Sequence, residues 1–163
     1  MMRLPKRLAP FVEAFEKVSL ICQVDKFIIA AICDRESGGG VYLIPRGPGG
    51  KGDKGFGHGL MQIDSRYHAK WIQKTAWWEP EENILYGARL LRENLDYFKG
   101  DEFPAIAAYN CSRAKVANFV NMCWTDINVR NVLIDRLTTN DNYASDVLER
   151  AEKFRAASAF RAV

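Results

Sequence analysis

The sequence predicts a single-domain α+β fold that is predominantly helical and carries a small irregular β lobe. Apolar residues recur at helical spacing through most of the chain, as they do on the buried face of an amphipathic helix. Residues 41–64 interrupt this pattern with an irregular, partly extended stretch. The 163 residues contain no repeat, low-complexity tract or long linker. We therefore expect one domain over residues 1–163.

Two helices are predicted before the interruption. The first begins at Pro10, because proline is favoured in the first turn of a helix. Its apolar face consists of Phe11, Ala14, Phe15, Val18 and Ile21. The second helix covers Lys26–Ser37 with Asp25 as its N-cap. Three glycines at residues 38–40 follow at once and are expected to end it.

The irregular lobe comes next. Residues 45–50 contain two prolines and three glycines and are expected to form an exposed loop. Residues 51–59 are too rich in glycine for a regular element, whereas residues 60–63 predict a short strand. The chain then turns back into a helix over residues 64–71.

Helices are predicted through the rest of the chain. A long one begins at Pro80, and others cover residues 104–109, 111–122, 128–137 and 141–157. The predicted buried face of the long helix is Ile84, Ala88, Leu91, Leu95 and Phe98. In the helix over residues 128–137 it is Val129, Val132, Leu133 and Leu137, and in the last helix it is Tyr143, Val147, Ala151 and Phe154.

Glu36 is the first candidate for chemistry. It lies seven residues after Ile29 on the apolar face of the second helix, while Asp34 and Arg35 fall on other faces. A carboxyl held against apolar neighbours has a raised pKa, which suits a general acid that must hold its proton near neutral pH. The glycines that follow would leave Glu36 at the lip of a cleft. The alternative interpretation is a carboxylate neutralised by an arginine in the core.

Asp53 and Asp64 supply the second half of a possible active site. An inverting glycoside hydrolase needs a protonated acid on one side of the sugar bond and a water-activating carboxylate on the other, roughly 6.5–9.5 Å away. Glu36 at a helix end and the two aspartates on a facing loop or strand can meet this requirement. On spacing alone, a solvated loop charge or a helix cap is the favoured interpretation of each aspartate.

Several motifs carry a resemblance to a known family. They are Glu36-Ser37, Gly59-Leu-Met-Gln-Ile-Asp64, Tyr67-His68 and Ala107-Ala-Tyr-Asn110. Over roughly residues 26–155 the chain resembles goose-type lysozymes and their relatives, the soluble lytic transglycosylases. The goose-type pattern has one acid at the end of the Gly-Leu-Met-Gln strand and another eleven residues earlier, which Asp64 and Asp53 match. The resemblance implies a lysozyme-like fold.

The resemblance also implies an activity and a mechanism. It implies a muramidase that cleaves the β-1,4 bond between N-acetylmuramic acid and N-acetylglucosamine in peptidoglycan, with inversion. Glu36 would protonate the leaving oxygen, while Asp53 and Asp64 would hold and activate water. This chemistry requires no cofactor and no metal.

Four further residues are predicted to bind substrate. Tyr109 and Asn110 resemble the family's substrate-contacting pair, in which a ring suits a sugar face and an amide bonds an N-acetyl group. A core tyrosine beside a helix cap is the alternative for this pair. Gln62 is expected to hold the strand or the sugar, and His68 to line the cleft. A metal pair of His68 with Asp64 is conceivable, but no clear third ligand is present.

The chain departs from the family after the Ala-Tyr-Asn motif. The family usually continues with small residues and glycine in a tight turn, whereas residues 111–114 contain no glycine. We therefore expect the backbone to differ there. Trp71, Trp77 and Trp78 could be platforms for sugar rings, but we expect them to pack structurally.

Two other functions stay open. A lytic transglycosylase would use Glu36 as both acid and base and leave 1,6-anhydro ends, and the presence of Asp53 and Asp64 argues against it. A wall-binding module without activity would keep the cleft, but it has no need to retain all three acids.

The expected partner of the protein is bacterial peptidoglycan, and we expect a monomer. The net charge of +3 suits approach to anionic peptidoglycan, while the basic residues are too scattered to suggest nucleic-acid binding. No apolar run reaches the length of a membrane span, so we expect no membrane insertion. No signal peptide is visible, and we expect an extracellular or cell-envelope location by an export route that the sequence does not identify.

Cys22, Cys33, Cys111 and Cys123 could form two disulfides, although Cys33 lies where a reduced cysteine packs as a small hydrophobe.

Overall fold

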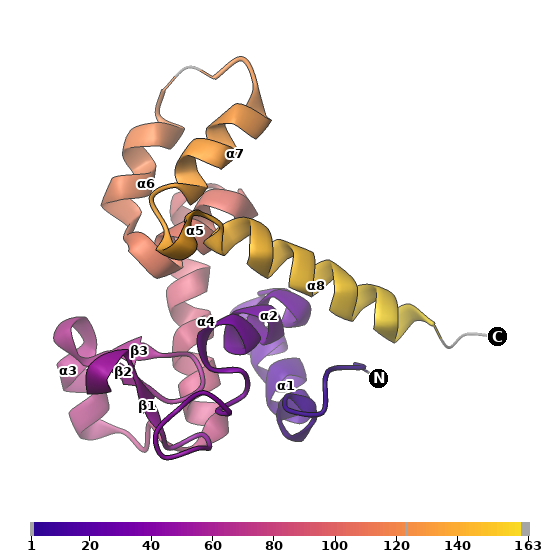
Figure 1. Ribbon diagram of the computed structural model, residues 1–163, viewed down its shortest axis with the longest axis vertical. Helices are drawn as coiled ribbons and strands as arrows, with labels where there is room; N and C mark the ends of the chain where they lie inside the picture. The colour runs from indigo at the N-terminus through magenta and orange to yellow at the C-terminus, as the bar shows by residue number, and fades with distance from the viewer. Residues whose placement is uncertain (1, 123, 161–163) are drawn as a thin grey trace. The chain divides into compact units, whose positions relative to one another are not determined.

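The computed structural model describes residues 2–122 and 124–160 and contains two compact units (Figure 1). The first comprises Met1–Arg89 and Arg150–Val163, and the second comprises Leu90–Glu149. Helices make up most of the described chain, and a small antiparallel sheet lies in the first unit. The predicted helix-dominant α+β fold is therefore confirmed. The expectation of one domain over residues 1–163 stays a prediction.

The first unit begins with η1 (Ala9–Phe11) and α1 (Val12–Cys22). Three of the predicted core residues, Phe11, Phe15 and Val18, are buried, but Ile21 is 53% exposed and was wrongly assigned. Cys22 is buried in its place. The reason is geometric, because positions 11, 15, 18 and 22 follow the helical repeat closely and Ile21 lies beside this row.

Helix α2 (Lys26–Ser37) begins and ends where the sequence predicts. The side chain of Asp25 accepts a hydrogen bond from the backbone nitrogen of Phe27 at 2.6 Å, which caps the first turn. Gly38, with a φ of 58°, ends the helix in the left-handed conformation that favours glycine. Helix α1 packs against α2, and residues 28–34 of α2 are all buried. A helix buried on several faces accommodates a charge only when that charge is paired.

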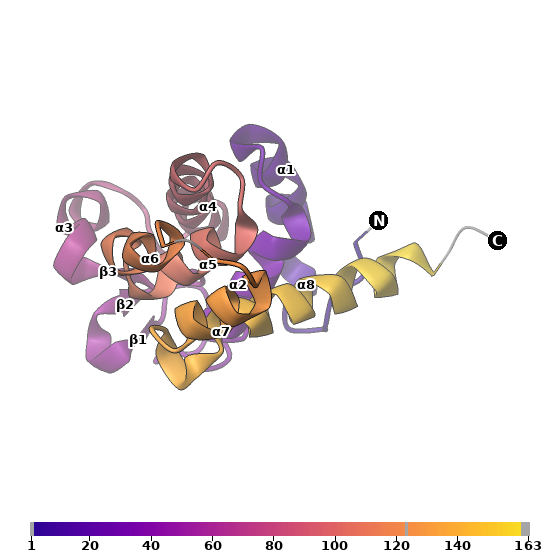
Figure 2. The ribbon, with the colours of Figure 1, turned by 90° about the horizontal axis from the view of Figure 1, so that it is seen from above.

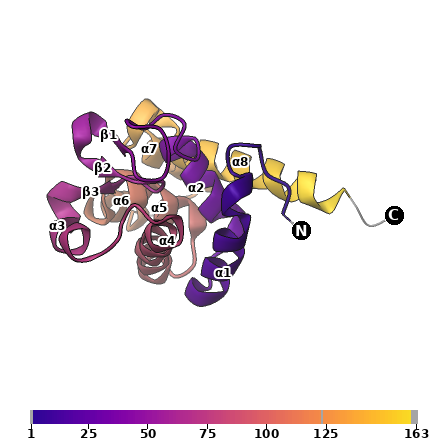
Figure 3. The same cartoon turned by 90° about the horizontal axis from the view of Figure 1, so that it is seen from below.

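Three short strands form an antiparallel sheet in the order β1–β2–β3, and Figure 3 shows them side by side, followed by α3. They are β1 (Lys51–Gly52), β2 (Gly57–His58) and β3 (Ile63–Asp64). Two expectations are wrong, since the glycine-rich residues 51–59 contain two strands and the strand predicted over residues 60–63 begins only at Ile63. Leu60 and Met61 are instead buried in a tight turn between Gly59 and Gln62, whose φ angles are 70° and 49°. A left-handed backbone cannot continue a strand.

The helices that follow the sheet agree with the sequence. Helix α3 (Ser65–Lys74) begins directly after β3, and helix α4 (Pro80–Tyr97) begins at the predicted proline. The predicted apolar stripe is buried at every position, namely Ile84, Ala88, Leu91, Leu95 and Phe98. The loop over residues 45–50 is only partly exposed, since three of its six residues are exposed, two are half-buried and Gly50 is buried.

The second unit is helical. Helix α5 lies beside α6 and α7 (Figure 2). The elements after α4 are α5 (Glu102–Cys111), α6 (Arg113–Val120), α7 (Ile127–Asp135), η3 (Thr139–Asp141) and α8 (Tyr143–Ala159), the last of which continues into the first unit. The predicted buried face of α8 is confirmed at Tyr143, Val147, Ala151 and Phe154.

The buried face predicted for α7 is wrong. Val129 and Val132 are 49% and 55% exposed, and the buried residues of this helix are Arg130, Ile134 and Asp135. Arg130 is paired with Asp101 at 2.8 Å. Asp135 accepts hydrogen bonds from two backbone nitrogens in the first turn of α8, at 2.8 and 3.2 Å. Partnered charges therefore face inward, which apolar periodicity could not reveal.

Cys22, Cys33 and Cys111 have free thiols, while Cys123 lies outside the described residues. Cys33 packs as the small hydrophobe that the sequence suggested, and its burial raises the pKa of the thiol to about 12. None of the helices within residues 2–122 and 124–160 has the length and apolar composition needed to cross a membrane.

Candidate active site

Glu36 lies in the last turn of α2, and its side chain is half-buried. The glycine turn that follows is required by close packing, because a Cβ atom on Gly39 would lie 2.4 Å from the backbone oxygen of Arg7. The turn thus ends the helix one residue after Glu36 and seats the N-terminal segment against it. Glu36 is therefore not sealed in the core, and its place at the lip of a cleft stays a prediction.

The fully buried carboxylate of α2 is Asp34, whose side chain is 1% exposed. The Nε atom of Arg7 donates to its Oδ1 at 2.6 Å, and Nη1 of Arg150 donates to its Oδ2 at 2.5 Å. The sequence suggested this neutralised role only as an alternative for Glu36. In the structure Asp34, two residues earlier, has this role.

Asp53 and Asp64 are brought together by the sheet. The register places Gly52 opposite Gly57 and Gly57 opposite Asp64, so these three residues form a row across the strands. Neighbouring strands lie about 4.8 Å apart. Asp53 follows Gly52 directly and opens η2 (Asp53–Gly55), so two acids eleven residues apart in the sequence reach the same edge of the lobe.

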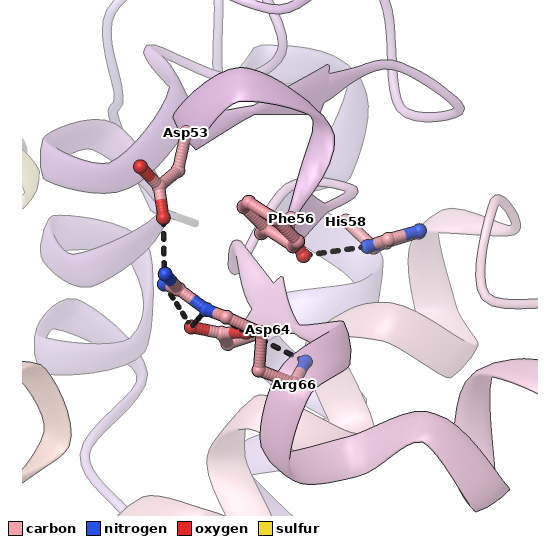
Figure 4. Close-up of polar contacts among 5 residues, drawn as sticks. All are labelled: Asp53, Phe56, His58, Asp64 and Arg66. Atoms are coloured by element: carbon pink, nitrogen blue, oxygen red, sulfur yellow. Dashed lines mark hydrogen bonds and ion pairs between the residues drawn. The ribbon is translucent and has the colours of Figure 1, made fainter.

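Arg66 bridges the two aspartates (Figure 4). Its Nη2 atom donates to Oδ2 of Asp53 at 2.7 Å and to Oδ2 of Asp64 at 2.5 Å. Its Nε atom donates to Oδ1 and Oδ2 of Asp64 at 2.9 and 3.0 Å. The backbone nitrogen of Arg66 also donates to Oδ1 of Asp64 at 2.8 Å, which caps α3. Asp64 is therefore a helix cap and a member of a charged cluster at once.

The cluster is electrostatically matched. The hydrogen bond from Arg66 is the main cause that lowers the pKa of Asp64, and the same contact raises the pKa of Arg66. Asp64 is 24% exposed at its side chain, against 56% for Asp53. The lowered pKa favours the charged form of Asp64, which a carboxylate that is to bind and activate water must have.

Gln62 holds the lobe together. Its Nε2 atom donates to the backbone oxygen of Gly59 at 2.8 Å. Its Oε1 atom lies close to the paired residues Gly52 and Gly57, since a Cβ atom on either glycine would lie 2.2 Å from it. The glycines of β1 and β2 therefore make room for Gln62, which explains why strands form in so glycine-rich a segment. Its predicted contact with sugar stays a prediction.

His68 lies one turn after Asp64 and contacts an aromatic pair. Its Nδ1 atom is 3.0 Å from the hydroxyl oxygen of Tyr86, and the two rings meet edge to face. Trp71 stacks on Tyr86 with ring centres 4.0 Å apart, in agreement with a packing role. Within the described residues no three His, Cys, Asp or Glu side chains are grouped to hold a metal ion.

Tyr109 and Asn110 lie in the second unit, near the end of α5, and both are half-buried. The Oδ1 atom of Asn110 accepts a hydrogen bond from the backbone nitrogen of Thr139 at 2.9 Å, which ties α5 to η3. The turn after α5 is made at Ser112, with a φ of 113° and a ψ of 143°. The chain thus makes a sharp turn without the family's glycine. The sugar-binding roles of Tyr109 and Asn110 stay predictions.

Comparison with known proteins decides the family. The family model described as "Lysozyme g" matches residues 5–158, which is nearly the whole chain. The chain belongs to the lysozyme g family.

Individual members of the lysozyme g family are about one third identical to this chain. Lysozyme g of Gallus gallus is 33% identical over 142 residues, which cover 81% of this chain and 57% of that protein. Lysozyme g of Struthio camelus is 31% identical over 150 residues, which cover 86% and 63% respectively. Lysozyme g of Takifugu rubripes is 30% identical over 151 residues, covering 85% and 70%. The chain therefore spans a little less than two thirds of the length of the two avian relatives.

The sequence did not point to two residues at or near this candidate site, Arg66 and Asp34. Arg66 is one of 23 basic residues that show no clustering along the sequence. The available signal was its place two residues after Asp64, in the first turn of a predicted helix, where its side chain can reach back to the cap. Asp34 had no local signal, because its partners lie 27 and 116 residues away.

Proposed function

We propose that this chain is a muramidase, which hydrolyses the β-1,4 bond between N-acetylmuramic acid and N-acetylglucosamine in peptidoglycan. The observation that carries the proposal is the pair of carboxylates of Asp53 and Asp64, joined by Arg66 at the edge of the β lobe. Membership of the lysozyme g family supports it. A chain that only bound the wall would have no use for two adjacent carboxyl groups.

In the proposed reaction Glu36 and the aspartates act on opposite faces of the sugar. Glu36 gives its proton to the oxygen of the leaving sugar as the bond from that oxygen to the anomeric carbon breaks. An aspartate takes a proton from the attacking water as the new bond to the anomeric carbon forms. The anomeric configuration is inverted because water enters from the side opposite the leaving oxygen. The reaction needs no cofactor and no metal.

The sugar contacts are assigned to four side chains. They are Gln62, His68, Tyr109 and Asn110. Aromatic rings suit the apolar faces of sugars, and amides suit N-acetyl groups. We further propose that the protein acts as a monomer on the bacterial wall, outside the cell or in the cell envelope.

Digestion of purified peptidoglycan by the wild type and by Glu36→Gln tests the function. Mass spectrometry of the products should find reducing N-acetylmuramic acid ends with the wild type and none with the variant. Anhydro ends would show that the protein is a lytic transglycosylase and not a muramidase. If both proteins left the wall intact, the remaining interpretation would be a wall-binding module without activity. Proton NMR of a fresh digest gives the anomer, and an initial α-anomer supports inversion.

A further inference from the structure

We propose that Arg66 is a positioning residue that divides the work between the two aspartates. It binds Asp64 as an anchor and holds Asp53 by one carboxylate oxygen, which leaves the other oxygen of Asp53 to accept a hydrogen bond from the attacking water. This inference rests on the proposed muramidase function and assigns roles within that site.

Asp64 is fully engaged by Arg66. Both of its carboxylate oxygens accept hydrogen bonds from Nε, Oδ2 also accepts one from Nη2, and Oδ1 accepts one from the backbone nitrogen. Charge-assisted bonds of this kind are about twice as strong as neutral ones. A carboxylate held by four such contacts is suited to fix its partner and poorly placed to take a further proton.

Asp53 is held at one oxygen only. Its Oδ2 accepts the bond from Nη2 of Arg66 at 2.7 Å, and no residue in the described part of the chain donates a hydrogen bond to its Oδ1. Its side chain is also more than twice as exposed as that of Asp64. In Figure 4 this second oxygen of Asp53 points away from Arg66. Asp53 therefore offers an oriented acceptor that water can reach.

The guanidinium group is fixed from a third side. The ring centre of Phe56 lies 4.6 Å from the guanidinium carbon of Arg66. The carbonyl oxygen of Phe56 accepts a hydrogen bond from the backbone nitrogen of Ser65 at 2.9 Å and lies 2.8 Å from Nδ1 of His58. The ring that supports Arg66 is thus tied to the start of α3, so the clamp belongs to the lobe as a whole.

The charges that face this cluster come from its own lobe and from α3. Asp53 and Asp64 face Arg66, Tyr67 adds a weaker interaction with Arg66, and His68 acts with Arg66 to lower the pKa of Asp64. Without Arg66 two carboxylates would share one site, and like charges at that distance raise the pKa of one member. Removal of Arg66 should therefore change the dependence of activity on pH as well as its rate.

Arg155 offers a matched control in the same unit. It also bridges two acids, donating from Nη2 to Asp25 at 2.8 Å and from Nη1 to Glu152. Its guanidinium carbon lies 5.5 Å from the ring centre of Phe27, and its side chain is 40% exposed, against 49% for Arg66. Arg155→Met removes the same kind of clamp from residues without an assigned role in the reaction.

The experiment measures kcat and KM on peptidoglycan fragments across pH for Arg66→Met, Arg66→Lys and Arg155→Met. Arg66→Met should lower kcat by up to about 10²-fold through misplacement of Asp53. The acid limb of its pH profile should move up by about one pH unit. Compared with Arg66→Met, Arg66→Lys should bring the acid limb part of the way back to its wild-type position, because lysine keeps the positive charge. It should restore little of the lost kcat, because lysine lacks the planar guanidinium group. Arg155→Met should change neither.

A second pair of variants tests the division of roles. Asp53→Asn should lower kcat by about 10²-fold or more, the usual contribution of a general base. Asp64→Asn keeps an oxygen for the cap and for Nε of Arg66, so it should cost at least about tenfold less than Asp53→Asn. Carbon-13 NMR of the Asp64 carboxyl, followed across pH in wild type and Arg66→Met, independently measures how far Arg66 lowers the pKa of Asp64.

The outcomes separate this inference from the proposed function. A wild type that leaves peptidoglycan intact overturns both. An active wild type overturns only the inference if Arg66→Met matches Arg155→Met in kcat and in its acid limb. An Asp64→Asn variant that loses as much activity as Asp53→Asn, or more, overturns it as well.

Discussion

Asp34 and Arg7 form a two-point ion pair, in which Nε and Nη2 of the arginine donate to Oδ1 and Oδ2 of the carboxylate at 2.6 and 3.0 Å. Arg150 of α8 adds a third bond at 2.5 Å. One buried carboxylate on α2 therefore joins the segment before η1 to the last helix. These contacts also fix the helix that carries Glu36, two residues beyond Asp34.

Asp34→Ala should lower the free energy of unfolding by about 3 kcal/mol, because breaking a buried ion pair leaves its partners uncompensated. The loss falls at the low end of the usual range since Arg7 and Arg150 are 37% and 30% exposed and can reach water. Urea unfolding followed by circular dichroism measures it. The control is Asp96→Ala, which removes a surface pair with Arg92 and should cost less than about 1 kcal/mol. Similar losses in both variants would mean that the buried ion pairs of Asp34 stabilise the fold no more than a surface ion pair does.

Gly57→Ala should destabilise the β lobe by about 1–3 kcal/mol, because the new methyl group would lie 2.2 Å from Oε1 of Gln62. Gln62→Ala removes that obstacle. The double variant should therefore cost less than the sum of the two single variants. A double-mutant cycle on the free energy of unfolding measures the coupling. Additive losses would show that Gln62 does not require the glycine.

Much of the fold could be predicted from hydrophobic spacing and helix ends. Helix α2 has the predicted bounds, and the stripes of α4 and α8 are buried as expected. These elements are decided by local signals, namely apolar periodicity, a capping aspartate at Asp25 and a left-handed glycine at Gly38. The three acids were singled out from motif spacing, and the sheet register explains why Asp53 and Asp64 meet.

Two of the errors involve polar groups whose partners no apolar pattern reveals. Helix α7 turns Arg130 and Asp135 inward because Asp101 and the start of α8 satisfy them. Glycine-rich strands form because the amide of Gln62 occupies the space above Gly57. No local pattern encodes such partners, so apolar periodicity alone placed Val132 in the core of the protein.

Ser112→Gly should raise the free energy of unfolding by about 1 kcal/mol. Ser112 has a φ of 113°, a conformation whose strain for a residue with a side chain is about 1–3 kcal/mol. Part of the gain is lost because glycine is more flexible when unfolded, which costs about 0.5–1 kcal/mol. Thermal unfolding measures the change, and Ser112→Ala, which keeps a Cβ atom, should give no gain. Equal stability of the two variants would mean that the strain is absent.

Arg66→Met should cost more stability at neutral pH than in acid. The bond from Arg66 lowers the pKa of Asp64 below its ordinary value of 3.8. A carboxyl with a lowered pKa in the folded state contributes stability above its ordinary value, and this contribution is lost as the pH falls through the lowered value. The difference in free energy of unfolding between wild type and Arg66→Met should therefore shrink between about pH 7 and pH 2.5.

Salt provides the control for this pH dependence. Arg66 and Asp53 are about half exposed at their side chains, so 1 M sodium chloride, where the screening length falls to about 3 Å, should reduce the difference at neutral pH. Asp64→Asn removes one of the two acid partners of Arg66, so the cost of Arg66→Met in that background should depend less on pH. A difference between wild type and Arg66→Met that is constant from neutral to acid pH would mean that Asp64 does not sense the arginine.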